Sequence, residues 1–282
     1  MGPPVTAVDQ PDTAAVEGPP WASVTSQRPA GGWEGADPRY RGYRPTKNGR
    51  VKLDHRVALA VDLVPLASGG RLVDLGAGDG FVTAELANAA GASLGVAVDV
   101  GFPPPLAPRR HGVSQVAAVV PGPLPFRDSS FDVVVSLECI EHLLDPDGLL
   151  EEAVRLLRPG GCLVLSTPRL DSLLVIVSLL LGVQPPGVES SPRRRYGNPF
   201  GEQRPSGHVH VFSRRAMSEA LAANGLELEA YREARFSSSW WQAVRASRRF
   251  PGPRDLLVRA VLGVYDLWPF KKDVMVLRAV PR

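Results

Sequence analysis

The stretch from residue 71 to residue 81 constrains the fold of this chain more than any other part of its sequence. A short apolar run at residues 72–75 ends abruptly in a turn with three glycines, and Phe81–Ala90 then has the pattern of a helix. Glycine lets the backbone adopt left-handed torsion angles and lets another group approach it closely. A strand, a glycine turn and a helix N-terminus in this order are typical of α/β proteins that hold a nucleotide at the end of a strand.

A second apolar run at residues 93–98 ends in Asp99, which lies 19 positions after Gly80. A carboxylate at the end of this second strand can accept hydrogen bonds from both hydroxyls of a ribose. A solvated strand end is the alternative for Asp99, and the glycine turn upstream favours the ribose. The dinucleotide fingerprint G-x-G-x-x-G needs a glycine at position 81, where Phe81 stands, so the spacing here is G-x-G-x-G.

This spacing, with Asp74 just before it, resembles the first motif of the class I S-adenosylmethionine-dependent methyltransferases. The resemblance implies that Asp74 lies near the methionine end of the cofactor, that the glycines pass beneath it and that Asp99 binds its ribose. The full set of cofactor-binding residues implied in this way is Asp74, Gly76, Ala77, Gly78, Gly80, Asp99 and Leu137. On the glycine turn alone, a tight strand–helix turn in another kind of α/β protein stays open.

A second block of motifs lies between residues 124 and 168. Phe131–Leu137 is a nearly unbroken apolar run that predicts a buried strand, and residues 147–157 have helical periodicity. The Pro-Gly-Gly sequence at residues 159–161 is predicted to stop that helix before a strand at residues 162–166. The phrases LPF-x-D-x-SFD, E-x-x-EH and L-x-PGG resemble motifs that occur in this order in the same family. The resemblance covers roughly residues 50–235 and implies a Rossmann-like, seven-stranded, mostly parallel sheet with helices on both faces.

The chemistry of methyl transfer points to the segment after the fourth strand. Transfer from a sulfonium is an in-line displacement, so the protein chiefly aligns the acceptor and removes its proton. Glu138 and the backbone at Leu137 follow that strand at the carboxyl edge, where ligands bind in such sheets. His142 lies about one helical turn further on and is the candidate general base. The alternative is that Glu141 and His142 cap or brace a helix.

The segment Glu138-x-x-Glu141-His142 also resembles two subfamilies, the ubiquinone-pathway O-methyltransferases and the small-RNA 2′-O-methyltransferases. In the latter, such a segment and a later histidine bind a divalent cation, and His208 would be the later histidine here. Two carboxylates and two imidazoles are suitable ligands for Mg²⁺, Mn²⁺ or another divalent ion. Similar segments occur in methyltransferases without a metal, so the sequence leaves this cofactor open.

Composition limits the setting in which the chain works. Of its 282 residues 44% are hydrophobic, enough for one core of ordinary size. Both cysteines, Cys139 and Cys162, fall in segments predicted to be buried, which favours a reducing compartment. Residues 1–45 are rich in proline and glycine without a period, so we expect a disordered extension before a methyltransferase domain at residues 46–282. With no run resembling a signal peptide, a cytoplasmic location is predicted, with peripheral membrane contact as an option.

An insertion is expected at about residues 169–207, and its segment 173–183 is apolar on all faces. Eleven residues are too few to span a bilayer at ~1.5 Å per residue, so a lid over an apolar acceptor or a membrane-surface contact is predicted, with a buried helix as the alternative. From position 190 onward there are 17 Arg or Lys residues against 8 Asp or Glu, and 15 against 21 before it. This asymmetry fits an anionic substrate, a membrane surface, nucleic acid or simply a solvated arginine-rich face.

Further elements are predicted around this core. A helix is expected at residues 51–66, and a loop or a single turn at the prolines of residues 103–108. Ser213 is the expected cap of a helix at residues 214–223, followed by an edge strand at 226–236 and an amphipathic helix at 255–267. The family resemblance implies that the last strand, at residues 273–280, inserts antiparallel near the edge of the sheet.

Together, the resemblance implies methylation of oxygen on a small or lipid-linked molecule with S-adenosylmethionine as donor. Two other functions stay open. Val120 stands where many relatives carry an acidic residue that contacts adenine, which favours a cofactor-binding protein without catalysis. The basic C-terminal part favours an RNA-directed methyltransferase, although no RNA-binding module is recognised and nucleic acid is the less favoured partner.

Overall fold

The computed structural model describes residues 43–45, 51–65, 69–101, 113–194, 196–197, 206–235 and 272–282. The described residues all belong to one compact unit, Asp37–Arg282. The proline loop at residues 103–108 and the amphipathic helix at residues 255–267 lie outside them. So does the predicted disordered extension at residues 1–45, except for residues 43–45, which form a strand.

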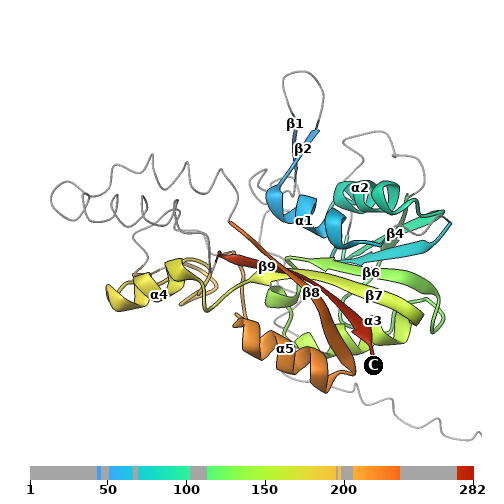
Figure 1. Cartoon of the computed structure of the whole chain (residues 1–282). Coiled ribbons are helices and arrows are strands. Elements are labelled where there is room, and N and C mark those ends of the chain that lie inside the picture. Colours follow the sequence, from blue (N-terminus) through green and yellow to red (C-terminus); the bar gives the residue numbers. More distant parts are fainter. Residues whose placement is uncertain are drawn as a thin grey trace, which may run out of the picture. The chain divides into compact units, whose positions relative to one another are not determined.

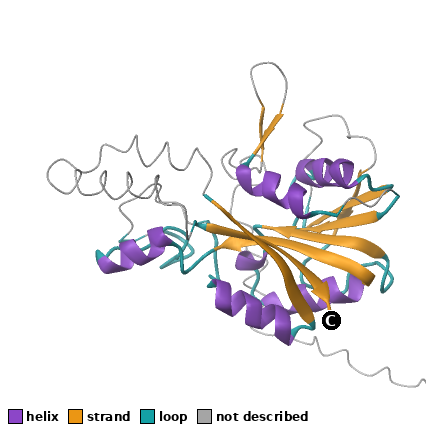
Figure 2. Ribbon diagram, in the orientation of Figure 1, coloured by secondary structure: helices purple, strands orange, loops and turns teal. Residues whose placement is uncertain are grey.

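Seven strands form one sheet in the order β5-β4-β3-β6-β7-β9-β8 (Figures 1 and 2). Their bounds are β3 Arg71–Leu75, β4 Leu94–Asp99, β5 Val113–Ala117, β6 Phe131–Leu137, β7 Leu157–Pro168, β8 Leu226–Ala234 and β9 Val274–Pro281. Strands β3 to β7 pair in parallel, whereas β9 is antiparallel to both β7 and β8. The mostly parallel sheet, the edge strand β8 and the inserted last strand are therefore confirmed.

Helices cover both faces of this sheet (Figure 2). They are α1 His55–Leu63, α2 Phe81–Ala90, α3 Pro146–Leu156, α4 Leu173–Leu180, α5 Arg214–Ala223 and the short 3₁₀ helix η2 Ile140–His142. One core cluster joins β3, β4 and β6 to α3 and α5, and a second joins the opposite face of the sheet to α1 and α2. None of the helices in the described residues combines the length and the apolar character needed to cross a membrane.

The predicted helix at residues 51–66 is wrong at its start. Val51–Leu53 forms strand β2, which pairs with β1, Tyr43–Pro45, in a separate two-stranded sheet. The helix begins only at His55, because the Asp54 side chain accepts a hydrogen bond from the Arg56 amide and caps it there. In contrast, Ser213 caps α5 as predicted, accepting from the Ala216 amide at 3.1 Å.

The Pro-Gly-Gly turn also lies elsewhere than predicted. Helix α3 ends at Leu156, and β7 starts at once because buried Leu157 already pairs with Phe131. Residues 159–161 therefore lie inside the first part of β7, where the register with β6 shifts between Phe131 and Val133. A side chain at Gly161 would come within 2.8 Å of the Asp132 carbonyl oxygen, so glycine permits this irregular pairing.

Candidate active site and cofactor cleft

The glycine turn joins β3 to α2 with three residues in the left-handed region, at φ angles of 81°, 59° and 77° for Gly76, Gly78 and Gly80. The amides of Gly76 and Ala77 both donate to the Val98 carbonyl, at 2.9 and 3.0 Å, which fixes the turn to the end of β4. A side chain at Gly76 would lie 2.4 Å from the Cys139 sulfur. Glycine is thus required at this position by both torsion angle and space.

Asp99 ends β4 next to this turn and organises it. One carboxylate oxygen accepts the Gly78 amide at 2.8 Å, and the amides of Gly101 and Val100 also hydrogen-bond to the carboxylate. Burial raises the pKa of Asp99, while these amides act in the opposite direction by stabilising the charged form. The residue predicted for the ribose therefore also holds the glycine turn in shape.

Asp74, predicted near the methionine end of the cofactor, is buried in β3. Its carboxylate accepts a 2.7 Å hydrogen bond from the Thr83 hydroxyl on α2, so it also braces the strand against the helix. Burial raises the pKa of Asp74 to about 7, with the Thr83 hydrogen bond lowering it and Asp99 raising it further. Ionisation of this carboxyl therefore depends on pH in the physiological range.

Glu138, the first residue after β6, is held by two partners. Its carboxylate accepts from the Arg56 guanidinium of α1 at 2.5 Å and from the Ser166 hydroxyl of β7 at 2.8 Å. The residue has a φ of 53°, which is uncommon for a side chain other than glycine and typical of functional sites. Because both of its carboxylate oxygens already accept a hydrogen bond, Glu138 fits a positioning role at the strand end better than the role of proton acceptor.

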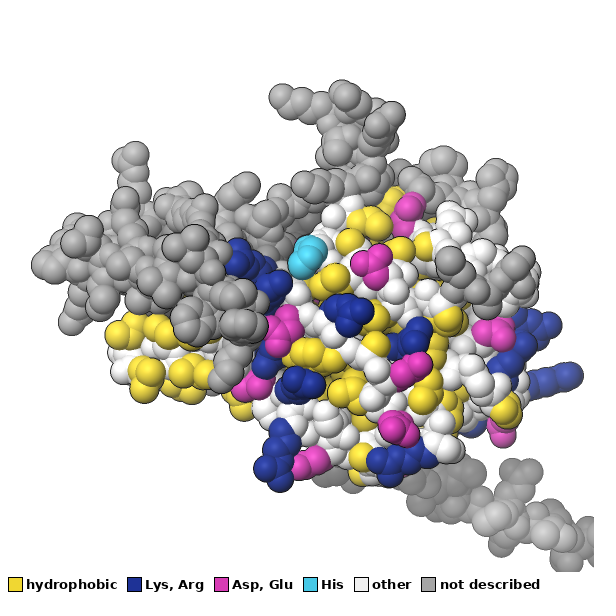
Figure 3. All heavy atoms as spheres, in the orientation of Figure 1, with side chains coloured by type: hydrophobic (Ala, Val, Ile, Leu, Met, Phe, Trp, Pro, Cys, Tyr) yellow, Lys and Arg dark blue, Asp and Glu magenta, His cyan; other side chains and the backbone are white. Residues whose placement is uncertain are grey.

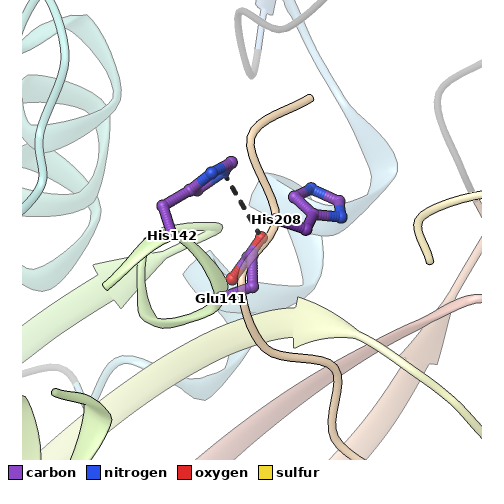
Figure 4. A group of neighbouring side chains, drawn as sticks. All are labelled: Glu141, His142 and His208. Atoms are coloured by element: carbon purple, nitrogen blue, oxygen red, sulfur yellow. Dashed lines mark ion pairs between the residues drawn. The ribbon is translucent and has the colours of Figure 1, made fainter. Parts of the chain in front are cut away.

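Three other predicted residues come together beside it: Glu141, His142 and His208 (Figure 4). Each offers one atom able to bind a metal, and these atoms lie within 4.8 Å of one another. The first two belong to η2, whereas His208 arrives at the end of the insertion. The amides of Val209 and His210 both donate to the Glu141 carbonyl, at 2.7 and 3.1 Å, which ties the two distant segments together.

The hydrogen bonds of the two imidazoles define their free nitrogens. His142 Nδ1 lies 3.1 Å from the Gly207 carbonyl oxygen, and His208 Nδ1 lies 2.8 Å from that of Gly187. A carbonyl only accepts, so Nδ1 carries the proton in each neutral ring and Nε2 keeps its lone pair. Burial, followed by the proximity of His208, lowers the pKa of His142, so its ring is neutral at pH 7.

Glu141 supplies a buried carboxylate to the same cluster. One oxygen accepts the Thr167 hydroxyl at 2.9 Å. The other, Oε1, has no hydrogen-bond partner within the described part of the chain and lies 4.0 Å from His142 Nε2. Burial, followed by the charge of Glu138, raises the pKa of Glu141 well above its ordinary value. The cluster therefore has oxygen and nitrogen lone pairs that can bind a proton or a cation.

The insertion both closes onto this cluster and carries an apolar helix. Glu189 accepts hydrogen bonds from the amides of Ser206 and Gly207, next to His208. In α4, Leu174, Val175 and Ser178 are buried, whereas Leu179 and Leu180 are 60% and 81% exposed. The helix is therefore buried on one side and exposed on the other. Further along the insertion, the two prolines at residues 185–186 are buried, whereas Arg193 and Arg194 are exposed.

Sequence reasoning missed several residues of the site. Arg56 and Ser166 hold Glu138, Thr83 holds Asp74, and Thr167 holds Glu141. For Ser166 and Thr167 a signal was present, because they lie near the end of β7, at the same carboxyl edge as Glu138. No such signal marks Arg56, whose role depends on how α1 packs.

Comparison with known proteins gives a consistent result. A model of the methyltransferase domain family matches residues 46–231. A 27-O-demethylrifamycin SV methyltransferase of Amycolatopsis mediterranei is 30% identical over 200 residues, covering 68% of this chain and 66% of that protein. A ubiquinone biosynthesis O-methyltransferase of Xanthomonas oryzae pv. oryzae is 33% identical over 123 residues, covering 42% of this chain and 48% of that protein. The matches thus span about two thirds and about half of these relatives.

Among solved structures, an S-adenosylmethionine-dependent methyltransferase from Mesorhizobium loti shares the fold, with a TM-score of 0.52 and 19% identity. The match covers 80% of this chain and 96% of that one. The sheet order, the glycine turn after β3 and the extent of the family match lead to one conclusion: the chain belongs to the class I S-adenosylmethionine-dependent methyltransferases.

Proposed function

We propose that this protein transfers the methyl group of S-adenosylmethionine to a hydroxyl oxygen of a small or lipid-linked acceptor. The observation that carries the proposal is the cluster of Glu141, His142 and His208 beside the end of β6. In a sheet of this topology the cofactor binds at the carboxyl edge, where the glycine turn, Asp99 and Leu137 lie. The cluster is at the same edge, on the side from which the insertion arrives.

The reaction needs one proton acceptor near the acceptor oxygen. We assign this role to His142, whose Nε2 has a free lone pair and whose ring is neutral because its pKa is lowered. The hydroxyl gives its proton to Nε2 while its oxygen attacks the methyl carbon. The carbon–sulfur bond breaks, and its electron pair neutralises the sulfonium to leave S-adenosylhomocysteine. Gly207 keeps the ring oriented through Nδ1.

The same residues fit a divalent cation. Glu141 Oε1 is buried without a hydrogen-bond partner in the described residues, and each neighbouring imidazole has its Nδ1 on a backbone carbonyl, an arrangement that orients metal-ligating histidines. Glu141, His142 and His208 would hold such an ion, which would supply a Lewis acid that makes the acceptor hydroxyl more acidic. His142 would then ligate rather than take the proton, so chelation separates the two roles.

The choice of oxygen and of an apolar acceptor is supported by separate observations. The rifamycin and ubiquinone relatives carry names that describe O-methylation, which favours oxygen here. The insertion that brings His208 to the cluster also carries the exposed leucines of α4, which favours a hydrophobic acceptor or contact with a membrane surface. We accordingly propose a cytoplasmic enzyme that meets its acceptor at or near a membrane.

Labelled cofactor tests this proposal. Lipid and aqueous extracts would be incubated with the protein and S-adenosylmethionine that carries a trideuterated methyl group, and products would be identified by mass spectrometry. We expect a labelled methoxy product in the lipid fraction, strongly reduced for His142→Ala. Cofactor that binds but is never turned over would instead select a binding protein without catalysis, and label recovered only in RNA would select the RNA-directed function.

A further inference from the structure

A second concave site lies at the sheet edge formed by β8. It is an open recess of about 430 Å³, a size within the ~300–1,000 Å³ range of small-molecule pockets. The residues around it come from α1, α5, β8 and the segment just before β9: His55, Leu59, Arg214, Tyr231, Arg232, Glu233 and Lys272. We call it the β8 recess. It shares no residue with the cofactor turn or with the Glu141 cluster.

Three cationic side chains and one acidic side chain, Glu233, line the β8 recess. Arg214, Arg232 and Lys272 have no carboxylate partner for their side chains among the described residues. The Arg214 guanidinium lies 4.3 Å from the centre of the Tyr231 ring, and Arg232 donates to the Tyr231 carbonyl at 2.9 Å. Neither contact neutralises a charge. Stacking on the ring does orient the Arg214 guanidinium.

The two acidic side chains nearby, Glu233 and Asp171, already accept hydrogen bonds. Glu233 accepts from the buried Arg169 and from the Lys272 amide, the latter at 3.1 Å. Asp171 accepts from Arg169 at 3.0 and 2.8 Å and caps the Arg214 amide at 3.3 Å. These two acids share the one buried guanidinium of Arg169, so the four cations and two carboxylates here have a net charge of +2. An uncompensated group of this kind attracts anions.

We propose that the β8 recess binds a phosphate group. Guanidinium and ammonium groups donate charge-assisted hydrogen bonds to the oxygens of a tetrahedral anion, which favours phosphate or diphosphate over a single carboxylate. Leu59 and the Tyr231 ring give the recess an apolar side for whatever carries the phosphate. This inference does not depend on the proposed methyl transfer.

The phosphate can come from a soluble phosphorylated molecule or from an anionic lipid headgroup. Figure 3 shows exposed apolar side chains where Figure 1 places α4, and several Lys and Arg side chains on the same face of the molecule. The recess lies near the start of α4. Asp171, two residues before that helix, contacts Arg169 and also accepts the amide of Arg214, which lines the recess. A headgroup in the recess would thus lie near the start of an apolar helix.

Calorimetric titration of the full chain with inorganic diphosphate tests the proposal. We expect binding with a dissociation constant below about 1 mM that weakens as salt increases. Arg232→Gln and Lys272→Gln should each weaken it by about fivefold or more, by analogy with the loss of one charge-assisted hydrogen bond. Arg215→Gln is the matched control, because Arg215 lies on α5 beside Arg214 but is 89% exposed, pairs with Glu219 and does not line the recess.

The result that overturns the proposal is absence of binding, or an equal loss in Arg215→Gln, which would indicate only general attraction to a basic surface. Thermal unfolding of each variant without ligand would show whether it folds. If Arg232→Gln does not fold, Lys272→Gln alone tests the proposal. Sedimentation with vesicles of phosphatidylcholine, with and without phosphatidylglycerol, then separates the sources. Binding to the anionic vesicles that diphosphate displaces identifies a headgroup, whereas diphosphate binding without vesicle binding identifies a soluble ligand.

Discussion

Asp99 has two separable roles that a pair of substitutions can resolve. Its carboxylate holds the glycine turn through the Gly78 amide, at 2.8 Å, and is also the group predicted to bind the cofactor ribose. Asp99→Asn keeps a carbonyl oxygen for the Gly78 amide but loses the charge and one acceptor. Asp99→Ala loses all of them.

The expected magnitudes follow from these contacts. A hydrogen bond to a charged group contributes about 1.5–3 kcal/mol, so the loss of one to the ribose should weaken S-adenosylmethionine binding by about tenfold or more in both variants. Only Asp99→Ala also leaves the Gly78 amide without its acceptor, so its free energy of unfolding should fall by a further ~1–3 kcal/mol relative to Asp99→Asn.

Calorimetry with S-adenosylmethionine and urea unfolding of the ligand-free chain measure the two effects. Thr83→Val provides a control, because it removes the partner of Asp74 from the same strand–helix junction while leaving Asp99 and its amide contacts in place. If both Asp99 variants bind the cofactor as tightly as the native chain, Asp99 does not touch the ribose. If Asp99→Ala and Asp99→Asn are equally stable, the Gly78 hydrogen bond does not hold the turn.

Three further predictions test the neighbouring groups. Because the native state keeps Asp74 protonated up to about pH 7 while the unfolded chain ionises near 3.8, stability should fall as pH rises between these values and then level off. The free energy of unfolding of Asp74→Asn should not fall with pH in this way, so above pH 7 the variant should be more stable than the native chain by roughly 2–4 kcal/mol in urea unfolding. If the native chain and the variant show the same dependence of stability on pH, the pKa of Asp74 is not raised. If a cation is held by the cluster, EDTA and His208→Ala should each abolish turnover with cofactor affinity unchanged. Activity that persists in EDTA would leave His142 as a simple base. Replacing the exposed Leu179 and Leu180 by serine should impair use of a hydrophobic acceptor without altering thermal stability, whereas a lower melting temperature would place these leucines in the core.

Local sequence patterns were sufficient to predict most of the sheet. The apolar run of β6 and the helix α2 have the predicted bounds, because an unbroken buried strand and a glycine-initiated helix are specified by neighbouring residues. The start of α1 was not predictable in this way, since apolar spacing continues through Val51–Leu53 and only pairing with β1 makes that segment a strand. The position of Pro-Gly-Gly inside β7 likewise depends on Leu157 pairing with Phe131.

Part of the candidate site could likewise be predicted from the sequence, and part of it could not. Asp74, Asp99 and Glu138 lie at strand ends, and their placement at one edge follows from parallel topology. That His208 meets Glu141 and His142 follows from the family resemblance, but the carbonyls that fix both imidazoles come from Gly187 and Gly207 in an irregular insertion. No periodicity describes such a loop, so those contacts and the salt bridge of Arg56 to Glu138 emerge only from the folded chain.

The most direct test of the proposed reaction is single-turnover transfer from S-adenosylmethionine with a trideuterated methyl group to a lipid extract, comparing the native chain with His142→Ala and His142→Gln. We predict a labelled methoxy product with the native chain and a large loss in both variants, while S-adenosylmethionine binding stays within about twofold. Equal transfer by the variants, or label on nitrogen or carbon rather than oxygen, would contradict it.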